Sequence, residues 1–482
     1  MKKIKKIMLA LPNSTWFGLK EWHSFPYLTG LLTAVLKKAG YEVKFLDTNI
    51  GNMDYDAVKK TIAEYNPDVV GVSCMSMEYA QNLSKMTELA KAVSSKIITV
   101  VGGTYPTLLP EEVIKDKNID YIVIGEGEYR LPKLLEYLEK GLPLEELDGL
   151  AYRKGENNII QKATTYIQNL DDLPFPDYED VDFSYYASKG NKFSYFLYPE
   201  NYPYAFTMTS RGCPFNCIFC SSRSVNGPGI RYRSAESILK EIDWLVEKYN
   251  IKEIIFLDDN IYLNKERIKK ILTGLIERKK KYQLKWKSPN VAIYAMDDEI
   301  LEMLKESGCY QITIAIESGT EEVLKLMKKP YRNLDKVWQV VNKAKSLGIA
   351  VTAMFVIGIP GETWAQIRET FRFAEELDLT YASFSIATPL PKTELLEIAL
   401  RDNLLPENFG FNQFNFKGYG KASIRTNEFT PDELQIARAF EWDRINFKKK
   451  EKLPIIAEMN GITLEELDQW RISTRRGLKL KD

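Results

Sequence analysis

The sequence predicts an α/β protein in which two sets of strand–helix units follow one another and a mostly helical region ends the chain. Short β-branched runs alternate with amphipathic helices over residues 5–140, and the alternation resumes after residue 204. The chain of 482 residues is also too long for one ordinary hydrophobic core. We therefore expect a first domain at 1–145, a linker at 146–204, a second domain at 205–395 and a C-terminal helical region at 396–482.

The first domain is expected to be a parallel sheet with helices on both faces, because each short apolar run is followed by a helical pattern. Its strands are expected at Lys6–Leu11, Glu42–Leu46, Val69–Ser73, Ile97–Val101 and Tyr121–Ile124. Ligands of such sheets bind beyond the carboxyl ends of the strands, so the turns there are candidate binding sites. Within the linker, the turn around Gly155 lies between two β-like runs and predicts a hairpin.

Charge and composition limit the partners of the protein. The 66 basic and 66 acidic residues cancel, so no net field draws the chain to nucleic acid, and a small-molecule, lipid or peptide substrate is expected. No segment approaches the roughly 18 uninterrupted apolar residues of a membrane span, so we expect no transmembrane segment and a cytoplasmic location. His23 is the single histidine, so imidazole chemistry is absent from nearly the whole chain.

Three of the five cysteines lie within eight residues, in Cys213-Pro-Phe-Asn-Cys217-Ile-Phe-Cys220, directly after an expected strand. Thiols this close could not pair as disulfides without strain, so they indicate metal ligation. Zinc normally takes four protein ligands, and no fourth ligand follows Cys220 at close range. Three thiolates instead suit a four-iron cluster that keeps one iron open. Cys74 and Cys309 lie in apolar stretches and are expected to be buried.

The spacing Cys-x-x-x-Cys-x-aromatic-Cys resembles the motif of the radical S-adenosylmethionine (SAM) superfamily, which places a ring such as Phe219 against the adenine. About six strand–helix units surround and follow the cysteines, which matches the partial (β/α)6 barrel of that superfamily, with its site at the carboxyl ends of the strands. The clearest strands are expected at Ala205–Ser210, Glu253–Leu257, Ile312–Ala315, Val351–Ile357 and Ser383–Thr388.

The same resemblance implies which strand ends contact SAM. Glu317 can accept from a ribose hydroxyl or the ammonium group, and Gly358 lets the backbone approach the adenine. Asp258 is a further candidate, although an aspartate there can also cap a helix. Arg233, like Arg231, can bind the methionine carboxylate in bidentate fashion, although a lone arginine more often forms a solvated ion pair.

Glycine-rich turns follow the fourth and fifth strands of the first domain, and glycines there let a ligand approach the backbone. They can equally be tight turns. The residues concerned are Gly102, Gly103 and Thr104 after the fourth strand, and Gly125, Glu126 and Gly127 after the fifth.

With Ser73-x-Met75 after the third strand, the Gly102-Gly103 turn resembles the cobalamin-binding domains of methionine synthase and its relatives. In that family Asp-x-His-x-x-Gly follows the first strand, and this chain has Asn13-Ser-Thr15-Trp-Phe-Gly18. The glycine is kept, and Thr15 replaces the cobalt-ligating histidine. His23 is expected to be a packed or surface histidine rather than a ligand. The change implies an altered cobalt–carbon bond, and it is also what a decayed, non-binding domain would show.

Together the two halves resemble the cobalamin-binding radical SAM family, with a Rossmann-like (flavodoxin-like) domain before the barrel. The resemblance implies a [4Fe-4S] cluster, SAM and cobalamin (as methylcobalamin) as cofactors, and an anaerobic C-methyltransferase that acts on an unactivated carbon through a 5′-deoxyadenosyl radical. It also implies a flavodoxin- or ferredoxin-type electron donor, and a C-terminal region that selects the substrate. Alternatives are an oxidative cyclase or ring-rearranging enzyme, and a non-catalytic cobalamin or cluster sensor.

Overall fold

The computed structural model describes residues 3–19, 25–186, 198–411 and 421–476, so His23 lies outside the described residues. The chain forms two compact units. Unit 1 contains Met1–Tyr186 together with Ser222–Arg231, and unit 2 contains Ala187–Ser221 together with Tyr232–Asp482. A short segment that follows the cysteine loop therefore returns to unit 1.

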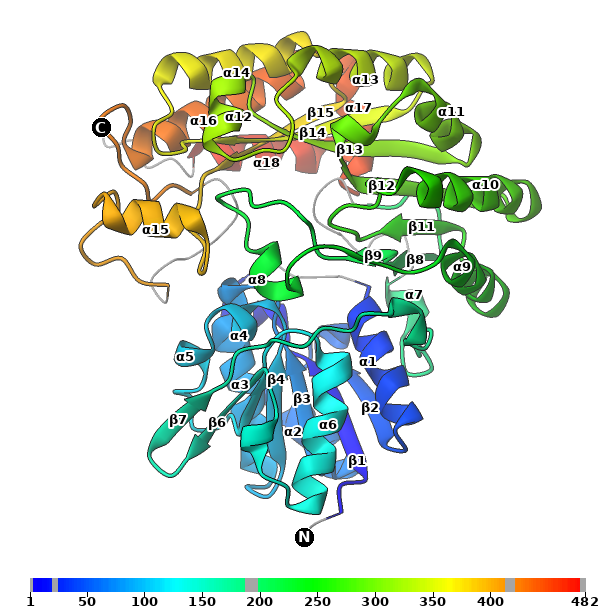
Figure 1. Ribbon diagram of the computed structural model, residues 1–482, viewed down its shortest axis with the longest axis vertical. Coiled ribbons are helices and arrows are strands. Elements are labelled where there is room, and N and C mark those ends of the chain that lie inside the picture. The colour runs from blue at the N-terminus through cyan, green and yellow to red at the C-terminus, as the bar shows by residue number, and fades with distance from the viewer. Residues whose placement is uncertain (1–2, 20–24, 187–197, 412–420, 477–482) are drawn as a thin grey trace. The chain divides into compact units, whose positions relative to one another are not determined.

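Unit 1 is built on a seven-stranded sheet in the order β2-β1-β3-β4-β5-β6-β7 (Figure 1). Strands β1 to β5 pair in parallel, which confirms the five expected strands. The expected hairpin also forms, and its first strand pairs antiparallel with β5, so the sheet continues beyond residue 145. The strands are β1 (Lys6–Leu11), β2 (Glu42–Asp47), β3 (Val69–Ser73), β4 (Ile98–Gly102), β5 (Tyr121–Val123), β6 (Leu150–Lys154) and β7 (Asn157–Ile160).

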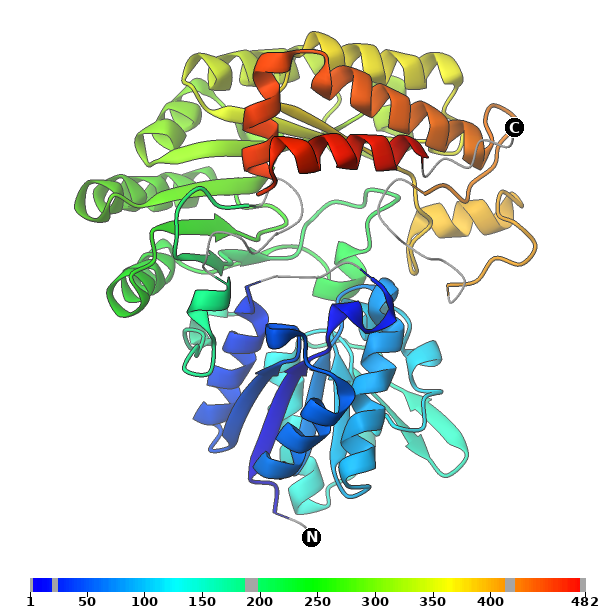
Figure 2. The same ribbon diagram turned by 180° about the vertical axis from the view of Figure 1, so that it is seen from behind.

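Helices cover both faces of this sheet, as the sequence predicts. On one face, α1 (Tyr27–Lys38) and α6 (Gly127–Lys140) bury residues such as Leu36 and Leu134 against β1 and β3 (Figure 1). On the other face, α2 (Tyr55–Tyr65) and α3 (Ala80–Val93) pack a second apolar layer (Figure 2). The order 2-1-3-4-5 reverses direction between β1 and β3, and ligands of such sheets bind at that point of reversal.

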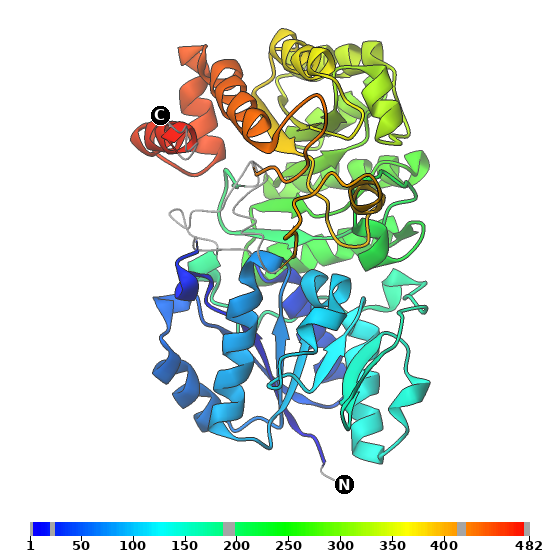
Figure 3. The ribbon, with the colours of Figure 1, turned by 90° about the vertical axis from the view of Figure 1, so that its left-hand side faces the viewer.

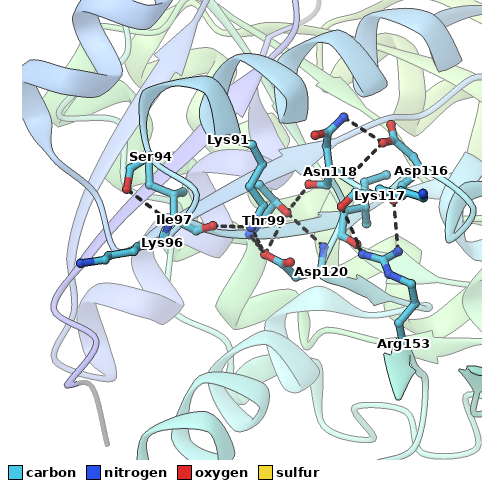
Figure 4. A network of polar contacts seen from close by, with 11 residues as sticks. Lys91, Ser94, Lys96, Ile97, Thr99, Asp116, Lys117, Asn118, Asp120 and Arg153 are labelled. Atoms are coloured by element: carbon cyan, nitrogen blue, oxygen red, sulfur yellow. Dashed lines mark hydrogen bonds and ion pairs between the residues drawn. The ribbon is translucent and has the colours of Figure 1, made fainter. Parts of the chain in front are cut away.

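A polar network closes the opposite end of the sheet, where β4 and β5 begin (Figure 4). Asp120 accepts hydrogen bonds from the Thr99 backbone N–H at 2.8 Å and from the Lys91 ammonium at 2.5 Å. Arg153, on the hairpin, donates to the carbonyls of Ile114 and Asp116 at 2.8 and 3.1 Å. The network lies at the amino ends of the strands, so it stabilises the fold away from the ligand-binding edge.

Unit 2 contains a six-stranded parallel sheet in the order β15-β14-β13-β12-β11-β8. The order follows the chain, and the two edge strands are not paired with each other, which is the arrangement of a partial (β/α)6 barrel and confirms the expected fold. The strands are β8 (Tyr204–Thr207), β11 (Glu253–Phe256), β12 (Lys285–Val291), β13 (Cys309–Glu317), β14 (Ala350–Ile357) and β15 (Tyr381–Ile386).

Five longer helices alternate with these strands. Ser234 caps the first of them, because its side chain accepts from the Ser237 N–H. These helices are α9 (Ala235–Tyr249), α10 (Lys265–Tyr282), α11 (Asp298–Glu306), α13 (Leu334–Ser346) and α14 (Trp364–Glu376). Among the described residues, no helix is both long and apolar enough to cross a membrane.

The C-terminal region is helical, as expected, and its last three helices gather beside one another (Figure 3). Helix α16 packs on β15, the edge strand of the sheet. The buried Asn446 side chain of α16 accepts from the Ala382 N–H at 2.7 Å and donates to the Ala382 carbonyl at 2.9 Å. One side chain therefore satisfies backbone groups that an edge strand would otherwise leave open. The helices are α15 (Glu394–Arg401), α16 (Pro431–Phe447), α17 (Leu453–Met459) and α18 (Leu464–Arg476).

Replacing Asn446 by Ala should lower the free energy of unfolding by about 2 kcal/mol, because it leaves two buried backbone groups of Ala382 without partners. Urea denaturation of the full chain measures this. The matched control is Lys448→Ala, which removes an exposed ion pair from the end of the same helix and should change the stability by less than about 1 kcal/mol. Equal losses for both variants would contradict the assigned role of Asn446.

Candidate cofactor sites

The cysteine loop follows β9 (Ser210–Arg211), next to the carboxyl end of β8. Two backbone hydrogen bonds of Ile218 fix the middle of the loop. Its N–H donates to the Met327 carbonyl at 3.2 Å, and its carbonyl accepts from the Leu395 N–H at 2.8 Å. Cys213 and Cys217 are partly buried and Cys220 is exposed, and none of the three forms a disulfide. The loop is therefore held by backbone contacts that leave its thiols available as ligands.

The donor set fits an iron–sulfur cluster better than zinc. Three sulfur atoms lie on one loop, although no group of three or more Cys, His, Asp or Glu side chains in the described ranges, these three thiols included, is gathered closely enough to hold a metal ion. A closed zinc site would need a fourth donor beside these thiols. Cys74 and Cys309 are buried in the cores, as expected, and burial raises the pKa of each thiol to about 12, so neither supplies that donor.

A buried ion pair lies beside the cysteine loop. Glu317 ends β13 in a left-handed conformation, with φ of 73°, and its carboxylate lies 3.2 Å from the Lys329 ammonium. Burial opposes the charge of Lys329, but Glu317, Tyr331 and Cys217 together outweigh it and raise the pKa of this ammonium above its usual value. Lys329 also favours the thiolate of Cys217, against the effect of burial, which raises the pKa of that thiol. No periodic pattern or motif in the sequence points to Lys329.

Asp258 and Arg233, both predicted to contact SAM, have partners inside unit 2. Asp258 is buried after β11 and accepts from the Thr209 N–H at 3.0 Å and from the Ser210 hydroxyl at 2.5 Å. Burial raises the pKa of Asp258, and these hydrogen bonds oppose that shift. Arg233 pairs with buried Glu241 at 2.6 Å. Asp258 therefore supports the segment that leads into the cysteine loop, and contact of either residue with SAM stays a prediction.

The turn after β14 contains the buried carboxyl group of Glu362. Gly358 has φ of 84°, and its N–H donates to Glu362 Oε2 at 2.6 Å, as the Ile359 N–H does at 3.1 Å. The second oxygen of Glu362 is buried and has no hydrogen-bond partner. Burial raises the pKa of Glu362 to about 7. Glu362 thus holds the turn in which Gly358 was predicted to contact the adenine. Phe219, the other predicted adenine contact, is half-buried on the cysteine loop.

At the ligand-binding edge of unit 1, the turn after β1 is fixed by asparagine side chains. Asn13 is buried, accepts from the Thr15 N–H at 2.9 Å and donates to Asn52 Oδ1 at 2.7 Å. The Thr15 hydroxyl lies 2.8 Å from Asn13 Oδ1, and Gly18 ends the turn in a left-handed conformation. Thr15 therefore occupies a rigid turn at the point where the sheet reverses. Asn52 was not predicted at this edge, because nothing near it in sequence points there.

Ser73 is the last residue of β3 and Met75 follows it at the same edge, where Met75 is 59% exposed. Gly103 has φ of 98°, and a Cβ there would lie 2.5 Å from the Cys74 carbonyl oxygen. The Gly102-Gly103 turn was expected to let a ligand approach the backbone. In the structure, the backbone of Cys74 approaches Gly103 closely instead. Thr104 then begins α4 (Thr104–Leu108).

The second glycine-rich turn follows β5, and its Glu126 side chain is bonded within unit 1. The buried carboxylate of Glu126 accepts from the Ile167 N–H at 2.7 Å and pairs with Arg231 at 2.7 Å. Gly125 N donates to the Thr107 hydroxyl at 2.9 Å, and Gly127 begins α6. The turns after β1, β3, β4 and β5 all lie at the carboxyl edge of one sheet, as predicted, although several of their polar groups bind each other.

Comparison with known proteins identifies both domains. Residues 207–374 match the model of the radical SAM superfamily, and residues 24–135 match that of the B12 binding domain. An uncharacterized methyltransferase of Pyrococcus horikoshii is 32% identical over 84% of this chain and 85% of its own length. The cytidylyl-2-hydroxyethylphosphonate methyltransferase of Streptomyces wedmorensis is 29% identical over 86% and 85%.

Solved structures show the same fold. The cobalamin-dependent SAM radical enzyme OxsB covers 99% of this chain and 72% of its own, with a TM-score of 0.73 at 18% identity. TsrM of Kitasatospora setae, a radical SAM methyltransferase, covers 82% and 76% with a TM-score of 0.68 at 19% identity.

These matches define a class of enzymes in which a cobalamin-binding domain precedes a radical SAM domain in one chain. The chain belongs to this family of cobalamin-dependent radical SAM enzymes, whose named relatives are mostly methyltransferases. Its cofactors are accordingly a [4Fe-4S] cluster, SAM and cobalamin. The expected family, fold class and enzyme class are thus confirmed.

The raised pKa of Glu362 predicts a pH-dependent stability. Because the folded pKa is about 7 and the ordinary value is 4.5, the folded state binds the proton more tightly, and stability falls as the pH rises from about 4.5 to about 7. Glu362→Gln should remove this loss, so wild type should be less stable than the variant at pH 8 by about 3 kcal/mol and similar at pH 4.5. Urea denaturation across this range measures the difference. Glu236→Gln, at an exposed site of α9, should show no such dependence.

Lys329→Met should lower the free energy of unfolding by about 3–5 kcal/mol, because it leaves the Glu317 carboxylate buried without its partner. Adding Glu317→Gln should restore most of the loss, since the pair is then neutral. The control is Lys343→Met, which breaks the more exposed pair with Glu302 and should cost less than about 1 kcal/mol. A double variant as unstable as Lys329→Met would show that the pair does not account for the loss.

Proposed function

We propose that this enzyme transfers a methyl group to an unactivated carbon of a small-molecule, lipid or peptide substrate. The observation that carries the proposal is the presence, in one chain, of an open three-thiol loop and of a cobalamin-domain edge that has Thr15 where a cobalt-ligating histidine would stand. Relatives named as methyltransferases support it, among them the Hopanoid C-3 methylase of Methylococcus capsulatus at 27% identity. When bound, the cluster with SAM supplies a carbon radical that removes hydrogen, and cobalamin supplies the methyl group.

Residues of unit 2 would bind the cluster and SAM, and residues of unit 1 would bind cobalamin. Cys213, Cys217 and Cys220 would hold the cluster, and Glu362 fixes the turn that would border SAM. The Thr15 hydroxyl is engaged by Asn13, so the lower side of the cobalamin site would be a fixed polar turn without an imidazole. The proposed SAM contacts are Phe219, Arg233, Asp258, Glu317 and Gly358. The proposed cobalamin contacts are Asn13, Thr15, Gly18, Ser73, Met75, Gly102, Gly103, Thr104, Gly125, Glu126 and Gly127.

The cluster needs an external electron for each reductive cleavage of SAM, and we propose a flavodoxin- or ferredoxin-type protein as its donor. A cytoplasmic location would suit the thiols of the cysteine loop, because reducing compartments keep thiols free for metal ligation. The C-terminal helices, outside the matched radical SAM region, would select the substrate.

A second candidate function is an oxidative cyclisation without methyl transfer. The anaerobic magnesium-protoporphyrin IX monomethyl ester cyclase of Rubrivivax gelatinosus is 26% identical over 81% of this chain and 68% of its own length. Enzymes that catalyse either reaction would share this fold, so the two candidate functions are distinguished by the fate of the SAM methyl group.

Anaerobically reconstituted enzyme, loaded with cobalamin and given SAM with a trideuterated methyl group, should place the label on cobalamin and release 5′-deoxyadenosine on reduction. Mass spectrometry reads both products. Cys217→Ala should lower 5′-deoxyadenosine formation by on the order of 100-fold or more, because the cluster loses one of its three ligands. Cys309→Ala, which removes a buried thiol outside the loop, should keep both products.

Formation of 5′-deoxyadenosine without any label on cobalamin would reject methyl transfer and favour the cyclisation. Absence of 5′-deoxyadenosine from correctly loaded enzyme would reject both.

A further inference from the structure

The segment Ser222–Arg231 begins two residues after Cys220 and belongs to unit 1, although the cysteine loop and the barrel belong to unit 2. Its helix α8 (Ser222–Asn226) packs against α4, the helix that starts at the Gly102-Gly103 turn. At Gly227, with φ of 80°, a Cβ would lie 2.6 Å from the Tyr166 ring. The chain that leaves the cysteine loop is therefore closely packed on the cobalamin-binding domain.

One arginine fastens the end of this segment. Arg231 donates to Glu126 Oε1, to the Ile167 carbonyl and to the Asn226 carbonyl, each at 2.7 Å. Its side chain is 9% exposed and that of Glu126 is 4% exposed. The guanidinium also lies over the Tyr166 ring, 5.4 Å from the centroid. Arg231 is thus a buried cation with four partners in unit 1, not a solvated surface charge.

Glu126 gives this ion pair its position. It lies between Gly125 and Gly127, in a turn at the carboxyl edge of the unit 1 sheet, and its second oxygen accepts from the Ile167 N–H. A hydrogen bond from Gly125 to Thr107 of α4 connects this turn to the helix on which α8 packs. The two glycine-rich turns proposed to border cobalamin therefore also carry the segment that follows the last cluster cysteine.

We propose that the Glu126–Arg231 ion pair couples the two cofactors, because it ties the exit of the cysteine loop to the cobalamin edge. The proposal rests on the proposed function, since it requires both cofactors to bind at these sites. A ligand that orders the Gly125–Gly127 turn holds Glu126 in place for Arg231, and a cluster that orders Cys220 restrains the start of the same segment. Cobalamin and the cluster then favour each other's binding, and this coupling is reciprocal.

The test is the affinity of the full-length protein for hydroxocobalamin, titrated anaerobically by visible absorption with and without the reconstituted cluster. Cluster loading should tighten binding to wild type by roughly 10-fold. In Arg231→Met the ratio of the affinities with and without the cluster should fall to near one. Glu126→Gln, which keeps the shape of the side chain, should give the same result, and it serves as the test if Arg231→Met folds poorly. Tryptic cleavage after Arg223, which is exposed, should also become faster in both variants.

Arg153→Met is the matched control, because Arg153 also bridges carbonyl groups of unit 1 but lies at the opposite end of the sheet. It should keep the roughly 10-fold ratio. Equal affinities in wild type with and without the cluster, or a ratio that survives both Arg231→Met and Glu126→Gln, would overturn the coupling alone. Failure of wild type to bind hydroxocobalamin at all would overturn the proposed function and the coupling with it.

Discussion

Parallel pairing of strands is the constraint on which the rest of this structure depends. In a parallel sheet every strand ends at the same edge, so loops that are far apart in sequence collect there. In unit 1 this brings the turns after β1, β3, β4 and β5 to one edge, and in unit 2 it places the cysteine loop, Asp258 and Glu317 at strand ends. Each sheet thereby forms the base of one proposed cofactor site, and the site residues lie within a few positions of the ends of its strands.

Buried charges then fix the shapes of these loops. Asp258 holds the entry to the cysteine loop, Glu362 holds the turn at Gly358, and Glu126 holds the exit segment through Arg231. A buried polar group is costly unless it is hydrogen-bonded, so each of these carboxyl groups favours the arrangement of its loop that supplies its partners. The same side chains that appear free to bind ligands in the sequence are largely occupied in the structure. This changes the interpretation of Arg231, which bonds within unit 1 rather than standing as a solvated ion pair.

The sequence predicted the strands with strong apolar runs and the sites with dense local motifs, because both signals lie within a few residues. It did not identify β12, whose sequence Lys285-Trp-Lys-Ser-Pro-Asn-Val is polar and contains a proline. Lys287 of this strand is buried, and burial lowers its pKa to about 8. Lys329, the hold of Glu362 on the Gly358 turn, and the pairing of Glu126 with Arg231, each expected separately as a ligand contact, were not predicted for a related reason. Their roles depend on partners brought close only by folding, and no spacing along the chain encodes that.

One chain of this enzyme is expected to hold a four-iron cluster and a cobalamin together. The decisive measurement is the iron and cobalt content of the protein after anaerobic reconstitution and gel filtration, determined by elemental mass spectrometry. We expect close to four iron atoms and one cobalt atom per chain. Iron at that level with no retained cobalt would contradict this expectation, because unit 1 would then be a Rossmann-like domain that does not bind cobalamin.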